Sequence, residues 1–160
     1  MQWELITNII LILSFIVLGV FFVLAIYQWV TRKSFKKIDR KLRWMPLPLL
    51  LMVITYFVFD KLIVLNTRPN GSGEPSFPST HVMIVTTIFF ITILALPKYI
   101  KKRWICVILD IVMLALISLV GTGRVLSGMH WPLDVFGALG FALIFSEIYL
   151  IATKCKRKKK

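Results

Sequence analysis

The sequence predicts an all-α membrane protein, a polytopic bundle of about five transmembrane helices. Hydrophobic residues make up 58% of the 160 residues, and the mean hydropathy is +0.83. Soluble domains are about half apolar or less, so a soluble fold of this length could not bury so much apolar surface. A chain of this length forms one compact unit. We therefore expect a single membrane-embedded domain over residues 1–160.

Five apolar runs are long enough to cross the hydrocarbon core, which takes about 20 residues of helix. Each should be a helix, because only helices satisfy their own backbone hydrogen bonds within lipid at these lengths. The first run follows an acidic start at Glu4 and is too long for a cleavable signal peptide, so we expect a retained span. The predicted spans cover about residues 5–30, 44–65, 80–96, 104–121 and 132–153.

The basic residues predict the orientation of the bundle. Seventeen of the 20 Lys and Arg residues lie in three segments: 31–43, 97–103 and 154–160. With five spans, these segments fall on one side, which the positive-inside rule assigns to the cytoplasm. The C-terminus is then cytoplasmic. The N-terminus and the loops 66–79 and 122–131 face outward, and we expect the membrane to be the plasma membrane.

The net charge of +13 would indicate nucleic acid as the partner of a soluble protein. Here topology and attraction to anionic lipid head groups account for most of it, so we expect membrane lipids and no nucleic acid as partners. Three basic residues remain, at or near the outer face, where the rule gives no reason for them: Lys61, Arg68 and Arg124.

The same outer layer holds both histidines and one carboxylate: His81, His130 and Asp134. Three cations, two imidazoles and a carboxylate at one membrane depth suit phosphoryl transfer. Fixed cations stabilise the negative charge that spreads over the equatorial oxygens of the phosphoryl group, and arginine forks match its geometry. We therefore expect a phosphate-binding site at the outer ends of the helices.

His130 is the candidate nucleophile, since an imidazole can attack phosphorus and form a phosphohistidine. Asp134 lies four residues later, which on a helix puts both side chains on one face. A hydrogen bond from one ring nitrogen of His130 to Asp134 would fix the tautomer and direct the other nitrogen. Pro132 is consistent with a helix that begins nearby.

His81 is the candidate general acid for the leaving group. It follows Pro78-Ser79-Thr80 at the start of the third span, where a helix N-terminus would direct free N–H groups at an anion.

Metal-ion catalysis is the competing route, and it needs several oxygen or imidazole ligands. The remaining outer carboxylates, Asp60, Glu74 and Glu4, are scattered and outnumbered by cations. We therefore expect no metal and no other cofactor.

Three spaced motifs occur in order along the chain. The first is Lys61, six residues and Arg68-Pro69; the second is Pro78-Ser79-Thr80-His81; the third is Gly123-Arg124, five residues, His130, three residues and Asp134. Together they resemble the motifs of the type 2 phosphatidic acid phosphatase and haloperoxidase superfamily, over roughly residues 61–145. The apolar spans favour the membrane branch, which acts on lipid phosphates.

The resemblance implies roles for eight residues. It assigns phosphate binding to five of them: Lys61, Arg68, Ser79, Thr80 and Arg124. It makes His130 the nucleophile, His81 the acid and Asp134 the residue that orients His130. It also implies hydrolysis without a metal.

Three departures from the family pattern are visible. Thr80 replaces the usual glycine, which restricts the backbone there. Gly123 replaces the usual serine, so one phosphate-binding hydroxyl is missing. The family core has six spans and five are predicted here, so either one N-terminal helix is absent or the run 1–30 hides an interfacial piece.

The expected reaction is metal-independent hydrolysis of a lipid phosphate or diphosphate at the outer membrane face. Undecaprenyl diphosphate is the leading substrate, and phosphatidylglycerol phosphate, phosphatidate and a lipid A phosphate stay open. A lipid phosphotransferase would use the same residues. A small transporter is the alternative of another class, because Asp110 and Glu147 lie within spans; we expect these two carboxylates to pair with the basic clusters. The sequence gives no oligomeric state.

Overall fold

The computed structural model describes residues 2–154, and over this range it contains helices and no strand, only an isolated bridge between Thr67 and Pro75. Five helical segments are long and apolar enough to cross a membrane, which confirms the predicted all-α bundle. The basic segment that begins at Lys154 was expected to reach residue 160, and all of it but Lys154 lies outside the described residues.

The spans follow the predicted order. The first is α1 (Gln2–Arg32), and the second combines α2 (Arg40–Trp44), α3 (Pro46–Phe57) and a π-helical turn (Val58–Leu62). The others are α4 (Thr80–Ala95), α5 (Arg103–Leu126) and α6 (Pro132–Lys154), with short 3-10 turns at Phe35–Lys37 and Leu96–Lys98. Helix α5 extends five residues beyond the predicted end at 121, so the third motif begins on its last turns.

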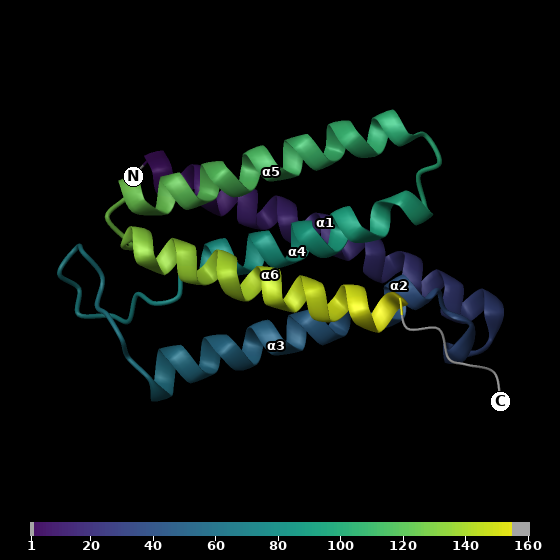
Figure 1. Cartoon of the computed structure of the whole chain (residues 1–160), viewed down its shortest axis with the longest axis horizontal. Helices are drawn as coiled ribbons and strands as arrows, with labels where there is room; N and C mark the ends of the chain where they lie inside the picture. The colour runs from purple at the N-terminus through teal and green to yellow at the C-terminus, as the bar shows by residue number, and fades with distance from the viewer. Residues whose placement is uncertain (1, 155–160) are drawn as a thin grey trace.

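Helix α4 is the centre of the bundle and contacts α1, α3, α5 and α6 (Figure 1). It is apolar on all sides, which is typical of a helix that is buried on all sides. Met83, Val85 and Phe89 are at most 1% exposed. The first turn of α4 therefore sits in the middle of the bundle at one end, which is where the second motif lies.

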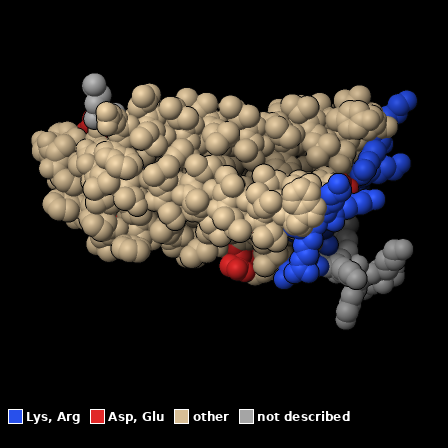
Figure 2. Space-filling model, turned by 90° about the horizontal axis from the view of Figure 1, so that it is seen from above, with Lys and Arg blue, Asp and Glu red and all other residues tan. Residues whose placement is uncertain are grey.

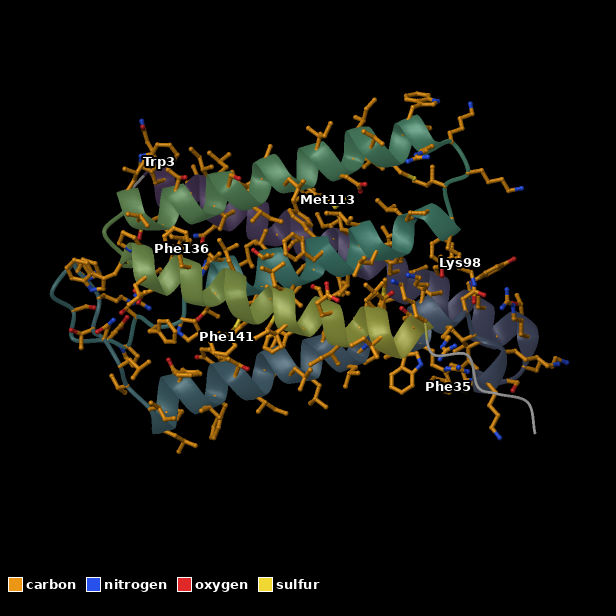
Figure 3. The ribbon with its side chains drawn as sticks, in the orientation of Figure 1. Trp3, Phe35, Lys98, Met113, Phe136 and Phe141 are labelled. Carbon is orange, nitrogen blue, oxygen red and sulfur yellow. The ribbon has the colours of Figure 1, made fainter. Side chains whose placement is uncertain are left out.

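The surrounding helices direct large apolar side chains outward. Phe22 of α1, Ile111 of α5 and Phe136 of α6 are each more than 60% exposed. Figure 3 labels Phe136 near the start of α6. Lipid is the solvent that such a surface requires.

Most charged side chains gather at one end of the bundle, around residues 33–39 and 99–102, which we call the basic end (Figure 2). Asp39 joins three segments there: it accepts a hydrogen bond from Gln28 at 2.9 Å and lies 3.3 Å from Arg32 and 3.2 Å from Lys98. Burial raises the pKa of Asp39, but these three donors outweigh it and hold the pKa below its ordinary value. The cluster fastens α1 and the 3-10 turn that follows α4 to the connection between the first two spans.

The two in-span carboxylates do not join this cluster. Within residues 2–154 neither Asp110 nor Glu147 forms an ion pair with Lys or Arg, and one carboxylate oxygen of Asp110 is buried without a hydrogen-bond partner. The expected pairing with the basic clusters is therefore not seen in the described part of the chain.

The opposite end carries the connections 63–79 and 127–131 and the first turns of α1, and we call it the motif end (Figure 1). Figure 3 shows Trp3 at this end and Lys98 at the other. An aromatic cluster fastens the long connection to α6: the rings of Phe59 and Phe141 each lie within 6.4 Å of Phe77. Gly137 makes this possible, because a Cβ there would collide with the Phe77 ring.

Candidate functional site

A cavity of about 270 Å³ opens at the motif end, between α1, the second span, α4 and α5. Five of the predicted site residues line it: Arg68, Thr80, His81, Arg124 and His130. Two more, Ser79 and Asp134, lie fully buried behind its wall, where the Ser79 N–H donates to the Asp134 carbonyl at 3.1 Å. The fold thus brings together seven of the eight predicted residues from three motifs.

His130 is 5% exposed, and its Nδ1 lies 2.8 Å from the backbone carbonyl oxygen of Ser76. A carbonyl only accepts, so Nδ1 carries the proton and Nε2 keeps its lone pair. The nearest Asp134 oxygen is 3.6 Å from Nδ1, which is too long for a hydrogen bond. The sequence predicted that Asp134 accepts a hydrogen bond from one ring nitrogen of His130, without saying which nitrogen. The carbonyl of Ser76 was missed, because a backbone acceptor leaves no signature in residue type.

Asp134 instead organises the start of α6. One carboxylate oxygen accepts the Trp131 N–H at 2.8 Å, as acidic residues do in the first turn of a helix. Its other oxygen is buried and has no hydrogen-bond partner among the described residues. Asp134 therefore fixes the turn that carries His130 and places a negative charge beside its ring.

The surroundings of His130 keep its imidazole neutral. Burial and the nearby Arg124 charge lower the pKa of His130 from 6.5 to about 4, against the opposite effects of the Ser76 carbonyl and Asp134. At neutral pH the unprotonated Nε2 is therefore available for bonding.

Two arginines bring unpaired donors to this cavity. Arg124 is 6% exposed, and Nε of both Arg124 and Arg68 is buried without a hydrogen-bond partner among the described residues. Arg68 also forms an ion pair with Glu74 at 2.7 Å through Nη1. Buried donors without acceptors are costly, and two like charges that face one cavity repel each other. An anion in the cavity would remove both penalties.

The second motif places His81 in the first turn of α4. Its Nε2 lies 3.0 Å from Oδ1 of Asn8 in α1, a residue that the sequence did not single out. Thr80 is the first residue of α4 and has helical backbone, so the usual glycine is not needed there. The hydroxyl of Ser79 is buried without a partner among the described residues, which adds a third unsatisfied donor near the cavity.

The absent serine of the third motif has a structural explanation. A Cβ at Gly123 would lie 2.8 Å from Cγ2 of Thr7 and 3.4 Å from the Trp3 ring. The start of α1 therefore occupies the space that a serine side chain would need.

Lys61 is the predicted residue that does not reach the cavity. It lies in the π-helical turn after α3, its side chain is 63% exposed, and it pairs with Asp60 at 2.8 Å. Asp60 lines the cavity in its stead. The phosphate-binding role of Lys61 stays a prediction.

Within residues 2–154 no three His, Cys, Asp or Glu side chains gather in a way that could hold a metal ion. Asp60 and Glu74 instead pair with Lys61 and Arg68. The residues of the cavity suit an anion better than a cation.

Known proteins are similar to this chain in sequence and in fold. The family model of the PAP2 superfamily matches residues 56–157. A curated relative, the undecaprenyl-diphosphatase of Sulfolobus acidocaldarius, is 27% identical over 143 residues; the match covers 79% of this chain and 65% of the relative, so the chain spans slightly less than two thirds of its length.

Among solved structures, the crystal structure of the first transmembrane PAP2 type phosphatidylglycerolphosphate phosphatase from Bacillus subtilis superposes with a TM-score of 0.72 at 21% identity. The match covers 99% of this chain and 80% of that one, which supports a shared membrane fold. With three motifs around one cavity and a family model that matches well over half of its residues, this integral membrane chain belongs to the PAP2 superfamily.

Proposed function

We propose that this chain is a metal-independent phosphatase that hydrolyses a lipid phosphate or diphosphate through a phosphohistidine on His130. One observation carries the proposal: the buried Nε groups of Arg68 and Arg124, which have no hydrogen-bond partner in the described part of the chain, share a cavity with a neutral histidine. An anion with an electrophilic centre is the ligand that this combination fits. A phosphate ester has both properties.

The reaction has two steps. Nε2 of His130 attacks phosphorus, the bond to the leaving oxygen breaks, and that oxygen takes a proton from His81. A water oxygen then attacks the phosphohistidine, the P–N bond breaks, and His81 takes back a proton from the water. Each bond formed is matched by one broken, and both histidines end as they began. For a diphosphate, the leaving group of the first step is the lipid monophosphate.

The phosphate oxygens would be held by the two arginines, the Ser79 hydroxyl and the Thr80 N–H. Buried donors of this kind are each worth about 10²- to 10³-fold in rate when they meet developing charge. Lys61 would join them only by leaving its ion pair with Asp60, so its contribution is proposed to begin when the substrate binds.

A lipid substrate is favoured by the walls of the cavity. Leu11 of α1, Tyr56 of α3 and Ile84 of α4 line the cavity, and the outer helices of the bundle carry lipid-facing residues. A phosphate head group can therefore reach the arginines while its apolar tail stays in the bilayer. A soluble phosphate would make no use of these apolar walls.

Undecaprenyl diphosphate is the first candidate lipid. The curated relative is an undecaprenyl-diphosphatase, whereas the solved structure is that of a phosphatidylglycerolphosphate phosphatase, which makes phosphatidylglycerol phosphate the second candidate. A second, open cavity of about 670 Å³ shares Arg68 with the first and runs along Trp131 and Leu133. This space could take a second phosphate or a larger head group. Phosphatidate and a lipid A phosphate complete the set to be tested.

The proposal is tested by phosphate release from purified protein in detergent with a chelator present, across these four lipids. Wild-type protein should release phosphate from at least one lipid, and His130→Ala should abolish release. Thr7→Val is the matched control, because valine has the shape of threonine and, within residues 2–154, the Thr7 hydroxyl bonds only to the Glu4 carbonyl of its own helix. Activity that vanishes with chelator and returns with added metal would contradict the metal-independent route.

The same assay separates the competing functions. A phosphotransferase would release phosphate only slowly and would transfer it to an added lipid acceptor. A transporter would release none while folded. Detection of a phosphorylated lipid product in place of free phosphate would mean that the reaction is transfer and not hydrolysis.

A further inference from the structure

The polar side chains of α1 differ in what they contact. Four Ser, Thr, Asn or Gln residues lie between residues 5 and 30 of this otherwise apolar helix. The hydroxyls of Thr7 and Ser14 donate to carbonyls of their own helix, and Gln28 binds at the basic end. Asn8 alone among the four contacts a residue of the cavity, His81. Asn8 is itself exposed near the outer end of α1, and His81 is the residue that its side chain contacts.

We infer that Asn8 is a positioning residue for His81: it holds Nε2, so that Nδ1 is the ring nitrogen that exchanges a proton with the leaving group and then with water. The inference rests on the proposed function, in which His81 is the acid. Asn8 precedes the segment 56–157 that matches the family model, and it belongs to none of the three motifs.

The amide suits this task better than a carboxylate. Oδ1 of Asn8 accepts the Nε2 proton at 3.0 Å, and it can do so whether or not Nδ1 carries a proton. The hydrogen bond therefore persists through both steps, before and after His81 gives up its proton. A carboxylate at this position would add a negative charge next to an anionic substrate.

Packing explains how α1 comes close enough to supply this group. Helix α1 contacts both α4 and α5, and its Thr7 lies against Gly123 with no room for a Cβ between them. Because Gly123 stands where the family has serine, the turn of α1 that carries Asn8 can pack close to α5. The chain has lost one polar group beside the phosphate site and has gained another from α1.

A purely structural role makes different predictions. If Asn8 only fastened α1 to α4, its loss would lower stability and would reduce activity equally for every substrate. If Asn8 positions His81, loss of the amide changes the tautomer of the His81 ring. Activity should then fall most for substrates whose leaving group needs a proton. Asn8→Leu removes the amide with little change of shape and favours lipid, so the variant should fold.

The first test reads the tautomer directly, without turnover. The chain has two histidines, so ring-¹⁵N histidine labelling gives two sets of signals, which His81→Gln assigns. At about pH 8, above the ordinary histidine pKa, we expect wild-type and Thr7→Val proteins to show His81 protonated at Nε2. Asn8→Leu should lose this preference, while His130 keeps its proton on Nδ1. An unchanged His81 tautomer in Asn8→Leu would overturn the inference.

The second test compares leaving groups. With an alkyl lipid phosphate, Asn8→Leu should lower kcat about 10- to 100-fold, part of the full effect of a general acid. With an aryl phosphate such as p-nitrophenyl phosphate, whose leaving group needs no proton, the loss should be less than about 3-fold. Equal losses for both substrates would also overturn the inference.

Failure of the proposed function would look different from failure of this inference. If wild-type protein turned over neither substrate, the phosphatase proposal would fall, whatever the tautomer of His81. If wild-type protein were active and Asn8→Leu matched it in both tests, only the role of Asn8 would be wrong.

Discussion

His130 combines two properties that a nucleophilic imidazole needs, a free lone pair and a fixed ring. The Ser76 carbonyl holds the proton on Nδ1, and burial beside Arg124 keeps a second proton from binding. Asp134 stands 3.6 Å away, so its charge can stabilise the positive ring that forms during attack without holding the ring in the resting state. Orientation and charge stabilisation are thus divided between two groups.

The pH dependence of kcat/KM should reflect this environment. Because the pKa of His130 is lowered from 6.5 to about 4, the ring stays neutral as the pH falls through the range where an ordinary histidine gains its proton. The His130 contribution to kcat/KM should therefore persist below pH 6.5 and be lost only near about pH 4. The profile is measured in detergent and corrected for ionisation of the substrate. A loss assigned to His130 that is centred near the ordinary histidine pKa would contradict the environment described here.

Substitution of Asp134 should cost less than substitution of His130. An asparagine oxygen can still accept the Trp131 N–H, and the Ser76 carbonyl still holds Nδ1, but the negative charge beside the ring is lost. We expect Asp134→Asn to fold and to lower kcat by roughly 10- to 100-fold, with His130→Ala inactive. Single-turnover rates check this order. A wild-type rate in Asp134→Asn would remove Asp134 from the mechanism.

Among the helices, the close packing of α1 against α5 explains why the third motif has glycine in place of the family serine. Gly123 lies against Thr7, so introducing the family serine at this position should be harmful. Overpacking of this kind costs about 1 to 3 kcal/mol and would push α1, with Asn8, away from the cavity. We expect Gly123→Ser to lower thermal stability and activity together.

A second substitution provides the control. In Gly123→Ser/Thr7→Ala, the methyl group that meets the new side chain is removed, so stability and activity should both recover in part. Thermal unfolding in detergent and phosphate release measure the two effects. If Thr7→Ala gave no recovery, the close approach of the two helices would not be the reason for the glycine.

The sequence predicted the elements well and their detailed contacts less well. Five apolar runs and the spacing of Arg68, His81 and His130 were enough to predict that these residues lie at one end of the bundle, where they line one cavity. The acceptor of the His130 proton was missed because it is a backbone carbonyl. Asn8 was missed because one amide in an apolar run carries no spacing signal. The outward direction of Lys61 depends on a π-helical turn that hydropathy does not reveal.

Across the whole molecule, the two ends of the bundle differ in charge and in the kind of residues that they hold. The basic end holds most Lys and Arg residues (Figure 2) and the Asp39 cluster, whereas the motif end holds the cavity. By the positive-inside rule we propose that the basic end and the C-terminus are cytoplasmic, and that the cavity opens on the non-cytoplasmic face of the plasma membrane. The substrate would then be hydrolysed outside the cytoplasm.

This orientation can be tested with single cysteines in a variant whose two native cysteines are replaced by serine. Ser72 is exposed at the motif end, and Lys36 is exposed at the basic end. In intact cells, a membrane-impermeant maleimide should label Ser72→Cys and should label Lys36→Cys only after permeabilisation. The reverse pattern would place the cavity in the cytoplasm.

In the proposed reaction His130 carries the phosphoryl group during hydrolysis. The most direct measurement is a rapid quench of wild-type protein with a lipid substrate labelled with ³²P in its terminal phosphate, in the presence of chelator. Phosphohistidine survives alkali and is lost in acid, so its linkage can be identified on the protein. We predict label on His130 in the wild type and none in His130→Ala. Release of labelled phosphate at the wild-type rate, with no protein-bound label on the millisecond timescale, would contradict a covalent intermediate on His130.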